Sequence, residues 1–76
     1  MPAQIELTAR ETEVLACLVQ GLPNKLIART LGMEVSTVKA HVTEILRALD
    51  VTNRTQAVLA VARLGLTFAT HVPKNL

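Results

Sequence analysis

Few residues of this chain combine a type and a spacing that could support catalysis or metal binding. His41 and Glu44 lie three positions apart, so on a helix they would face the same side and could place two metal ligands together. One imidazole and one carboxylate make only half of a metal site, and the single cysteine, Cys17, excludes a cysteine-based zinc site. The sequence also lacks a nucleophile–base pair, a glycine-rich phosphate loop and paired carboxylates. It therefore predicts a protein without enzymatic activity, metal or cofactor.

The distribution of charge indicates a polyanionic partner instead. The net charge is only +2, and residues 1–20 carry three acids against one base. Residues 21–56 carry three acids against five bases, which are Lys25, Arg29, Lys39, Arg47 and Arg54. A polyanion would therefore be expected to dock on the middle of the chain.

Composition and periodicity predict an all-α fold. The 76 residues allow one domain; half of them are hydrophobic and only Phe68 is aromatic, which favours closely packed helices around an aliphatic core. Apolar residues at helical spacing predict four helices, over about residues 9–20, 25–31, 35–49 and 54–64. No apolar run approaches the roughly 18 residues that span a bilayer. The single cysteine fits a reducing compartment, so we expect a soluble, cytoplasmic protein with no membrane partner.

Capping residues and glycines mark the helix ends. Thr8 and Glu11 are spaced as a capping box, in which each side chain bonds the backbone N–H of the other residue. Asn53 and Gln56 offer a second capping box, and Asn24 is expected to cap the short second helix. A glycine follows three of the helices and provides their stop signal: Gly21, Gly32 and Gly65.

The third predicted helix has one apolar stripe and one polar face. The stripe, which should face the core, consists of Val38, Val42, Ile45 and Leu49. The opposite face consists of Ser36, Lys39, Ala40, Thr43 and Arg47, with Thr37 and Glu44 beside it. These side chains are mostly short and partly basic, so the helix backbone could come close to a partner. The major groove of B-DNA is wide enough to admit one such helix.

A short helix, a turn containing Gly32 and a second helix with a polar face form the helix-turn-helix layout. The same pattern is also that of an ordinary soluble helical bundle, because an amphipathic helix with one lysine and one arginine on its wet side is common. Pattern alone therefore leaves both interpretations open.

Several polar residues have a structural and a functional interpretation. Glu11 is expected to serve the capping box, with Arg54 as a further ion-pair partner, rather than to act as a catalytic carboxylate. His41 lies at the edge of the core stripe, where packing or one hydrogen bond explains it, although a phosphate contact is the alternative. Asn53 and Arg54 could touch DNA, but capping and a salt bridge account for them equally well. Cys17 is expected to be a small core residue.

The fourth predicted helix is apolar on most of its sides, which indicates that most of its sides are buried. Four short helices cannot cover it completely, so a partner surface is implied. We expect Val58, Leu59 and Ala62 to form this second face. The alternative is that the tail folds back over the helix, with Phe68 filling the gap.

Five segments, taken in order and without gaps, resemble one known family. They are LTARETEVL at 7–15, GLPNKLIARTLGM at 21–33, STVKAHV at 36–42, ILRALDVTNRTQAV at 45–58 and ARLGL at 62–66. The sequence resembles the LuxR-type helix-turn-helix domain, the DNA-binding half of quorum-sensing regulators and of many response regulators. The resemblance implies a domain over residues 7–66, preceded by a lead-in at 1–6 and followed by a tail at 67–76.

The resemblance also implies how such a domain works. The third helix would read the major groove, with Lys39, Ala40 and Thr43 at positions of base and phosphate contact. Asn24 and Lys25 match phosphate-contacting positions at the start of the second helix. Residues near the DNA backbone at the start of the reading helix would be Thr37 and, on the same polar face, Ser36. The fourth helix would form a two-fold dimer through Val58, Leu59 and Ala62.

Two positions depart from the family pattern. Glu34 stands where relatives usually have Ser or Thr to cap the third helix, and glutamate is a weaker N-cap although its charge suits the positive helix end. Ala48 stands where relatives often carry lysine, so Arg47 is the candidate to replace that phosphate contact.

We therefore expect a sequence-specific DNA-binding domain of a bacterial transcription regulator, dimeric on a two-fold symmetric site and only weakly dimeric in isolation. RNA polymerase is the expected further partner, and a receiver or ligand-binding domain outside this chain would carry the signal. The alternative is a small helical interaction or adaptor module that does not bind DNA. A carrier protein of this size would be acidic with an Asp-Ser-Leu attachment site, whereas this chain is basic and lacks it.

Overall fold

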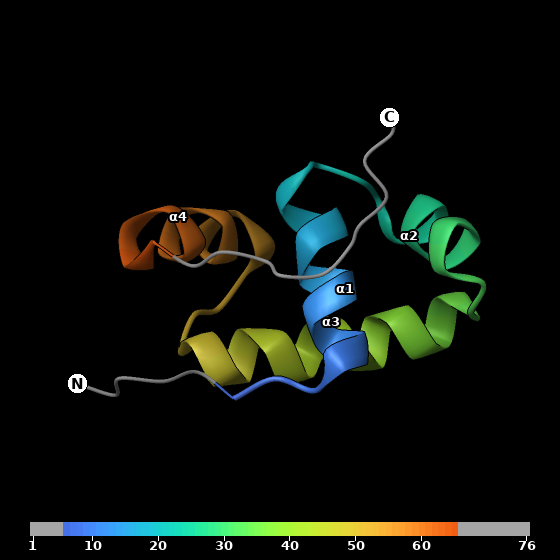
Figure 1. The fold of residues 1–76 in the computed structure, drawn as a ribbon, viewed down its shortest axis with the longest axis horizontal. Helices are drawn as coiled ribbons and strands as arrows, with labels where there is room; N and C mark the ends of the chain where they lie inside the picture. The colour runs from blue at the N-terminus through green and yellow to red at the C-terminus, as the bar shows by residue number, and fades with distance from the viewer. Residues whose placement is uncertain (1–5, 66–76) are drawn as a thin grey trace.

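The computed structural model describes residues 6–65, and the regular structure in that range is entirely helical. Figure 1 shows the four helices, which are α1 (Ala9–Val19), α2 (Asn24–Leu31), α3 (Val35–Leu49) and α4 (Arg54–Leu64). The predicted all-α fold with four helices is confirmed, and each boundary lies within about a residue of its expected position. Within this range no helix is long and apolar enough to cross a membrane.

Local capping explains where α1 and α4 begin. The Thr8 hydroxyl accepts from the Glu11 backbone N–H at 3.0 Å, and the Glu11 carboxylate accepts from the Thr8 N–H at 3.1 Å, so the first capping box is complete. At α4, the Asn53 side chain accepts from the Gln56 N–H at 2.9 Å. The Gln56 side chain does not return this bond but accepts from the backbone N–H and hydroxyl of Thr52. The second box therefore has one arm only.

The predicted cap of α2 is wrong. Pro23, rather than Asn24, occupies the N-cap position and makes no side-chain capping bond, while Asn24 is the first residue of the helix. The reason is tertiary: the Asn24 side-chain oxygen accepts a hydrogen bond from the Arg54 guanidinium at 2.7 Å. A proline just before the helix satisfies the local geometry because it has no N–H that needs a partner.

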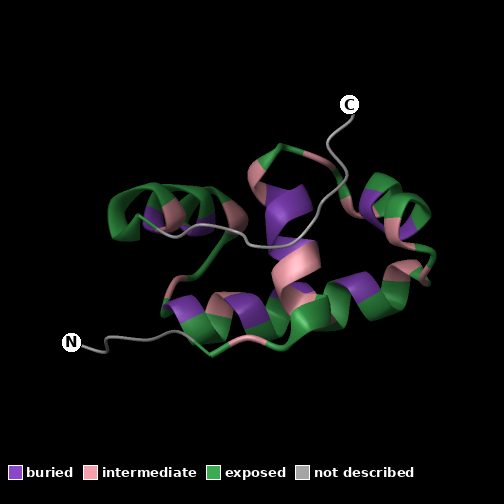
Figure 2. Ribbon diagram, in the orientation of Figure 1, coloured by how far each residue is buried: buried purple, intermediate pink, exposed green. Residues whose placement is uncertain are grey.

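The buried stripe predicted for α3 forms the base of the core. Val38, Val42, Ile45 and Leu49 are all buried. They pack against α1, whose five consecutive residues Val14, Leu15, Ala16, Cys17 and Leu18 are also buried. Figure 2 shows this concentration of buried positions on α1 and on one side of α3. Such a run can be buried all round only because α1 contacts each of the other three helices.

Helices α2 and α4 stand at opposite ends of α3, with α1 between them (Figure 1). They do not pack against each other. Their link is Arg54, which donates to the Asn24 side chain and, at 2.7 Å, to the Leu22 carbonyl. At the other end of α2, Arg10 of α1 donates to the Leu31 carbonyl at 2.7 Å. Two guanidinium groups therefore hold the two ends of a helix that would be too short to be stable alone.

The expected ion pair between Glu11 and Arg54 does not form within residues 6–65. Arg54 is occupied by Asn24 and Leu22, and the Glu11 carboxylate lies 3.8 Å from Nδ1 of His41 instead. The alternative in which Phe68 covers α4 concerns a residue outside the described range.

The Arg54 contacts predict a measurable loss of stability. Arg54→Ala removes two hydrogen bonds from a charged, half-buried donor, so we expect the free energy of unfolding in urea to fall by about 2 kcal/mol. Arg63→Ala, at an exposed position of the same helix, is the matched control and should change it by less than about 0.5 kcal/mol. Equal stability of the two variants would contradict the proposed role of Arg54.

Candidate nucleic-acid interface

A three-residue turn fixes α3 relative to α2. Gly32 ends α2 with φ 68°, in the left-handed region that glycine adopts without strain. The Met33 N–H then bonds back to the Ala28 carbonyl at 2.9 Å, and Glu34 is the extended residue before α3. Because Met33 also packs against the core, the turn is tied down on both sides. Helices α2 and α3 thus form one rigid unit.

The outer side of α3 is the exposed face opposite the core stripe. The structure places there the five residues that the sequence predicted for this face, Ser36, Lys39, Ala40, Thr43 and Arg47, and Thr37 beside them; all six are exposed. We call these six residues the reading face, for the role predicted from the sequence; Figure 2 shows that α3 has exposed positions along its length. None of them contributes a buried side chain to the core. The face is therefore free to contact a partner.

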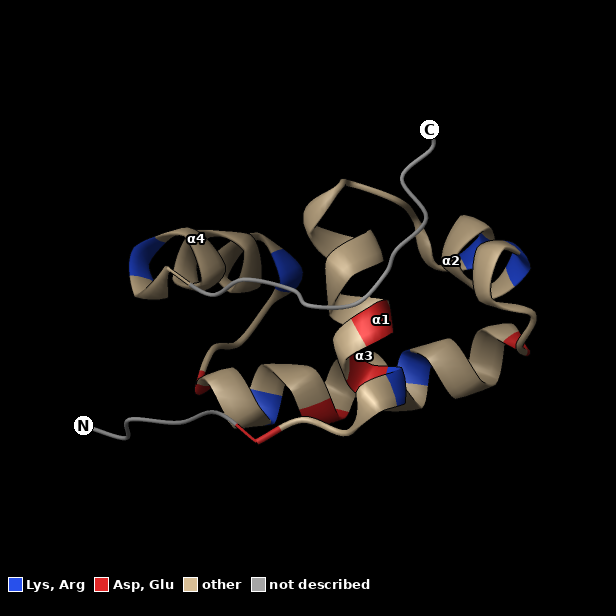
Figure 3. Ribbon diagram, viewed as in Figure 1, with Lys and Arg blue, Asp and Glu red and all other residues tan. Residues whose placement is uncertain are grey.

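The residues predicted on α2 have different environments. Lys25 is exposed, whereas Asn24 is half-buried and its side-chain oxygen is bonded to Arg54. Arg54 therefore occupies one acceptor position of Asn24, and its backbone N–H and side-chain amide hydrogens can still be offered to a partner. Figure 3 shows that the charged residues of α2 are all basic. Along α3, one basic residue is followed by an acidic one and then by a second basic one.

Two side chains of the reading face are already engaged within α3. The Thr43 hydroxyl donates to the Lys39 carbonyl at 3.1 Å, which leaves its oxygen lone pairs and its methyl group for a partner. Arg47 donates to the Glu44 carboxylate at 3.0 Å. Glu44 was predicted to lie beside the face, but its pairing with Arg47 was not predicted, although the i, i+3 spacing of the two residues indicates such a pair.

The N-termini of α2 and α3 both lack a side-chain cap. Their N-cap carbonyls, from Pro23 and Glu34, accept the N–H groups of the third and fourth residues that follow. No capping side chain therefore accepts a hydrogen bond from the first backbone N–H groups of either helix. Free N–H groups at a helix N-terminus, together with the helix dipole, favour the binding of an anion. Glu34 occupies the N-cap of α3 without a side-chain bond, in keeping with its weak capping ability.

The remaining candidate residues make contacts within the fold. His41 is half-buried beside Glu11 at the edge of the core, Asn53 caps α4, and Arg54 holds α2. Cys17 is 1% exposed, and burial, together with the nearby Glu13 charge, raises the pKa of its thiol. Over residues 6–65, no group of three His, Cys, Asp or Glu residues could hold a metal ion.

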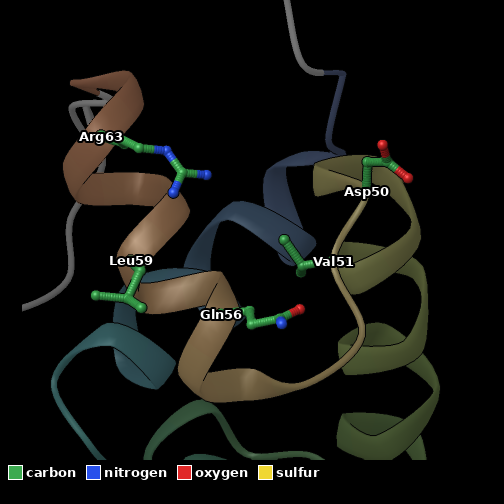
Figure 4. A pocket seen from close by; sticks show the side chains of 5 residues that line it. All are labelled: Asp50, Val51, Gln56, Leu59 and Arg63. Atoms are coloured by element: carbon green, nitrogen blue, oxygen red, sulfur yellow. The ribbon is translucent and has the colours of Figure 1, made fainter.

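The outward side of α4 carries an apolar stripe. Ala57 and Ala60 face the core, whereas Val58 is 37% and Leu59 is 57% exposed, and Ala62 is exposed with them. Figure 4 shows Leu59 at the rim of a hollow of about 330 Å³ whose lining also includes Asp50, Val51, Gln56 and Arg63. We call Val58, Leu59 and Ala62 the α4 stripe.

Residues 6–61 match the family model of bacterial regulatory proteins of the luxR family. The chain belongs to this family. NarL of Escherichia coli (strain K12), the nitrate/nitrite response regulator protein, is 45% identical over 56 residues, which are 74% of this chain and 26% of NarL. The transcriptional regulatory protein LiaR of Bacillus subtilis (strain 168) is 46% identical over 57 residues, or 75% of this chain and 27% of LiaR. The chain thus spans about a quarter of the length of these curated relatives.

Solved structures share the LuxR-family fold. The transcription factor GerE is 37% identical with a TM-score of 0.69, covering 78% of this chain and 88% of GerE. The LuxR-type receptor VqmA of Vibrio cholerae is 28% identical with a TM-score of 0.79, covering 86% of this chain and 30% of VqmA. The family model, the curated relatives and the fold agree: this is a LuxR-type helix-turn-helix DNA-binding domain of the kind found in transcription regulators.

Proposed function

We propose that this LuxR-family domain binds a two-fold symmetric DNA site as a dimer, with α3 of each protomer in the major groove. The observation that carries the proposal is the reading face, a set of six exposed residues on a helix whose other side is fixed in the core. A rigid helix with small side chains at its centre can approach base edges closely. We assign the DNA-binding unit to residues 7–66, flanked by the segments 1–6 and 67–76.

The centre of the reading face would contact the bases. Lys39 is exposed and can donate to a guanine edge or to a nearby phosphate. Ala40 and Thr43 are small, so they let the helix axis sit close to the groove floor. Because the Thr43 hydroxyl hydrogen is bonded to the Lys39 carbonyl, Thr43 would act as an acceptor or through its methyl group, which suits a thymine methyl.

The edges of the interface would contact phosphates. Lys25 is exposed at the first turn of α2, where the backbone N–H groups of Asn24 and Lys25 have no capping side chain. Ser36 and Thr37 lie in the corresponding first turn of α3. Such helix N-termini fix the orientation of a protein on the duplex without reading its sequence.

Dimerisation would place two reading faces on the same side of the DNA. The α4 stripe leaves large apolar side chains in solvent, and burying them against a second copy would remove that cost. The structural relative VqmA is a dimer that has a target DNA and whose conformation shifts in the absence of that DNA, which supports a dimer as the DNA-binding form here. Half-sites would then lie about one helical turn, roughly 34 Å, apart.

The proposed regulatory context is a bacterial promoter in the cytoplasm, without catalysis by the domain itself. The curated relatives in the comparison are transcription regulators rather than enzymes. RNA polymerase is the proposed partner on DNA, and a receiver or ligand-binding domain would supply the signal.

Lys39→Ala should weaken binding to an operator selected from random duplexes. The lost contact predicts a change of about 1–3 kcal/mol in binding free energy, measured by gel shift or fluorescence anisotropy. Arg29→Ala removes one positive charge from an exposed position outside the reading face and serves as the control. A folded Lys39→Ala protein that binds as tightly as the wild type would contradict the assignment of Lys39.

Binding should weaken steeply as salt rises. If Lys25, Lys39 and Arg47 together neutralise two or three phosphates per protomer, a dimer neutralises about five, and log affinity should fall against log salt with a slope of about −4 to −5. Titrations at several salt concentrations measure this slope. A value near zero would be incompatible with the proposed phosphate contacts, and absence of binding to every duplex would favour an adaptor module instead.

Leu59→Glu should abolish cooperative binding to a full palindrome while single half-site binding survives. The substitution places a charge in a small apolar contact, and small interfaces give weak association, so the isolated domain should be largely monomeric when dilute. Ultracentrifugation and gel shifts with full and half sites measure both effects.

Leu64→Glu is the matched control, because Leu64 is 45% exposed on the same helix but lies about 140° around it from Leu59. It should retain cooperativity. Wild-type cooperativity of Leu59→Glu would show that the α4 stripe is not the dimer contact.

A further inference from the structure

We propose that Glu44 competes with DNA phosphate for Arg47, and so limits the affinity of the domain for DNA. The inference rests on the proposed function, because it assumes that the reading face docks on a duplex. It assigns to Glu44 a positioning and regulatory role at that interface, in which the carboxylate acts on DNA through a neighbouring side chain rather than by touching it.

The geometry of the pair supports this role. Glu44 and Arg47 lie one turn apart on α3, and a guanidinium nitrogen of Arg47 is 3.0 Å from the Glu44 carboxylate oxygen. The Arg47 side chain is 71% and the Glu44 side chain 51% exposed. Arg47 belongs to the reading face and Glu44 lies beside it, and neither is used by the core.

The Arg47 side chain makes no other hydrogen bond within residues 6–65. The Arg10–Glu13 pair on α1 has the same i, i+3 spacing, but Arg10 also donates to the Leu31 carbonyl and so holds α2. Arg47 donates to Glu44 alone among the described residues. The Glu44–Arg47 pair consequently has no comparable tertiary role, and its main effect is on the charge that α3 presents.

Charge arithmetic shows the consequence for binding. Arg47 is the last base of α3, and the neighbouring Glu44 cancels its charge within one helical turn. A DNA phosphate can bind the Arg47 guanidinium in one of two ways. Either the guanidinium leaves the Glu44 carboxylate, or the phosphate binds while the carboxylate stays close and repels it. An exposed ion pair of this kind is weak enough for phosphate to displace, so the competition reduces affinity without preventing binding.

The test is a double-mutant cycle of Glu44→Gln and Arg47→Ala, measured on a duplex with one half-site over a series of salt concentrations. Freeing Arg47 should make Glu44→Gln bind about two- to fivefold more tightly than the wild type. It should also steepen the salt slope by about 0.9, the value for one additional phosphate contact. In the Arg47→Ala background, Glu44→Gln should change neither quantity.

Glu34→Gln is the matched control, because Glu34 is an exposed acid at the start of the same helix and has no ion pair within the described range. It removes the same charge without freeing a base, so any gain in affinity should persist in the Arg47→Ala background. Circular dichroism confirms that each variant remains folded.

Four results would overturn the inference. An equal gain from Glu44→Gln with and without Arg47 would mean that the carboxylate only repels DNA in general. A loss of affinity would mean that Glu44 itself contacts DNA, for example a cytosine amino group. If the wild type binds its selected duplex and Lys39→Ala weakens that binding while Glu44→Gln has no effect, the inference alone fails. If the wild type binds no duplex, the proposed function fails and takes the inference with it.

Discussion

The hydrogen bonds of Arg54 connect the two parts of the domain that have no packing contact of their own. Helix α2 packs against one end of α3, and α4, which carries the apolar stripe, packs against the other end. The guanidinium at the start of α4 bonds the Asn24 side chain and the Leu22 carbonyl at the start of α2. The planar guanidinium holds two acceptors with donors in a fixed fork, whereas the three donors of a lysine ammonium sit on one nitrogen and rotate. This one side chain therefore adds a direct tie between α4 and the start of α2, beside the packing of both helices on α1 and α3.

Helix α1, which is buried at the centre of the domain, adds apolar packing to the hydrogen bonds of Arg54. Its five consecutive buried residues touch all three other helices, so a chain with a single aromatic residue still has a continuous core. The core is small, and polar links at both ends of α2 add to what apolar burial provides. The domain thus reaches a fixed geometry with few large side chains, which leaves the outer sides of α3 and α4 unconstrained by packing.

Most of the fold could be predicted from the sequence because its signals are local. The capping box at Thr8 and the glycine after α2 fixed the helix ends, and the spacing of Val38, Val42, Ile45 and Leu49 identified the buried side of α3. The cap assigned to Asn24 was wrong because its partner, Arg54, lies 30 residues away. No local pattern distinguishes an asparagine that caps its own helix from one that accepts a bond from a distant arginine. The same limit applies to Glu11, whose neighbour is His41 rather than Arg54.

The positions of the candidate site residues on α3 could be predicted from the sequence, but the hydrogen bonds between their side chains could not. Helical periodicity placed six residues on the exposed side of α3, and the family resemblance assigned roles to them. The bond from Thr43 to the Lys39 carbonyl depends on a side-chain rotamer, and so does the pairing of Arg47 with Glu44. Periodicity reports where a side chain lies, whereas these bonds determine which of its atoms remain available.

The complete separation of the two sides of α3 has an evolutionary consequence. No residue of the reading face is part of the core, and the three-residue turn from Gly32 to Glu34 holds the helix without using any of that face. Under the proposed function, mutations that change which sequence is recognised would therefore not have to be matched by compensating mutations in the interior. A lineage can duplicate such a gene and diverge in target choice through a handful of surface codons, while the scaffold stays under constant selection.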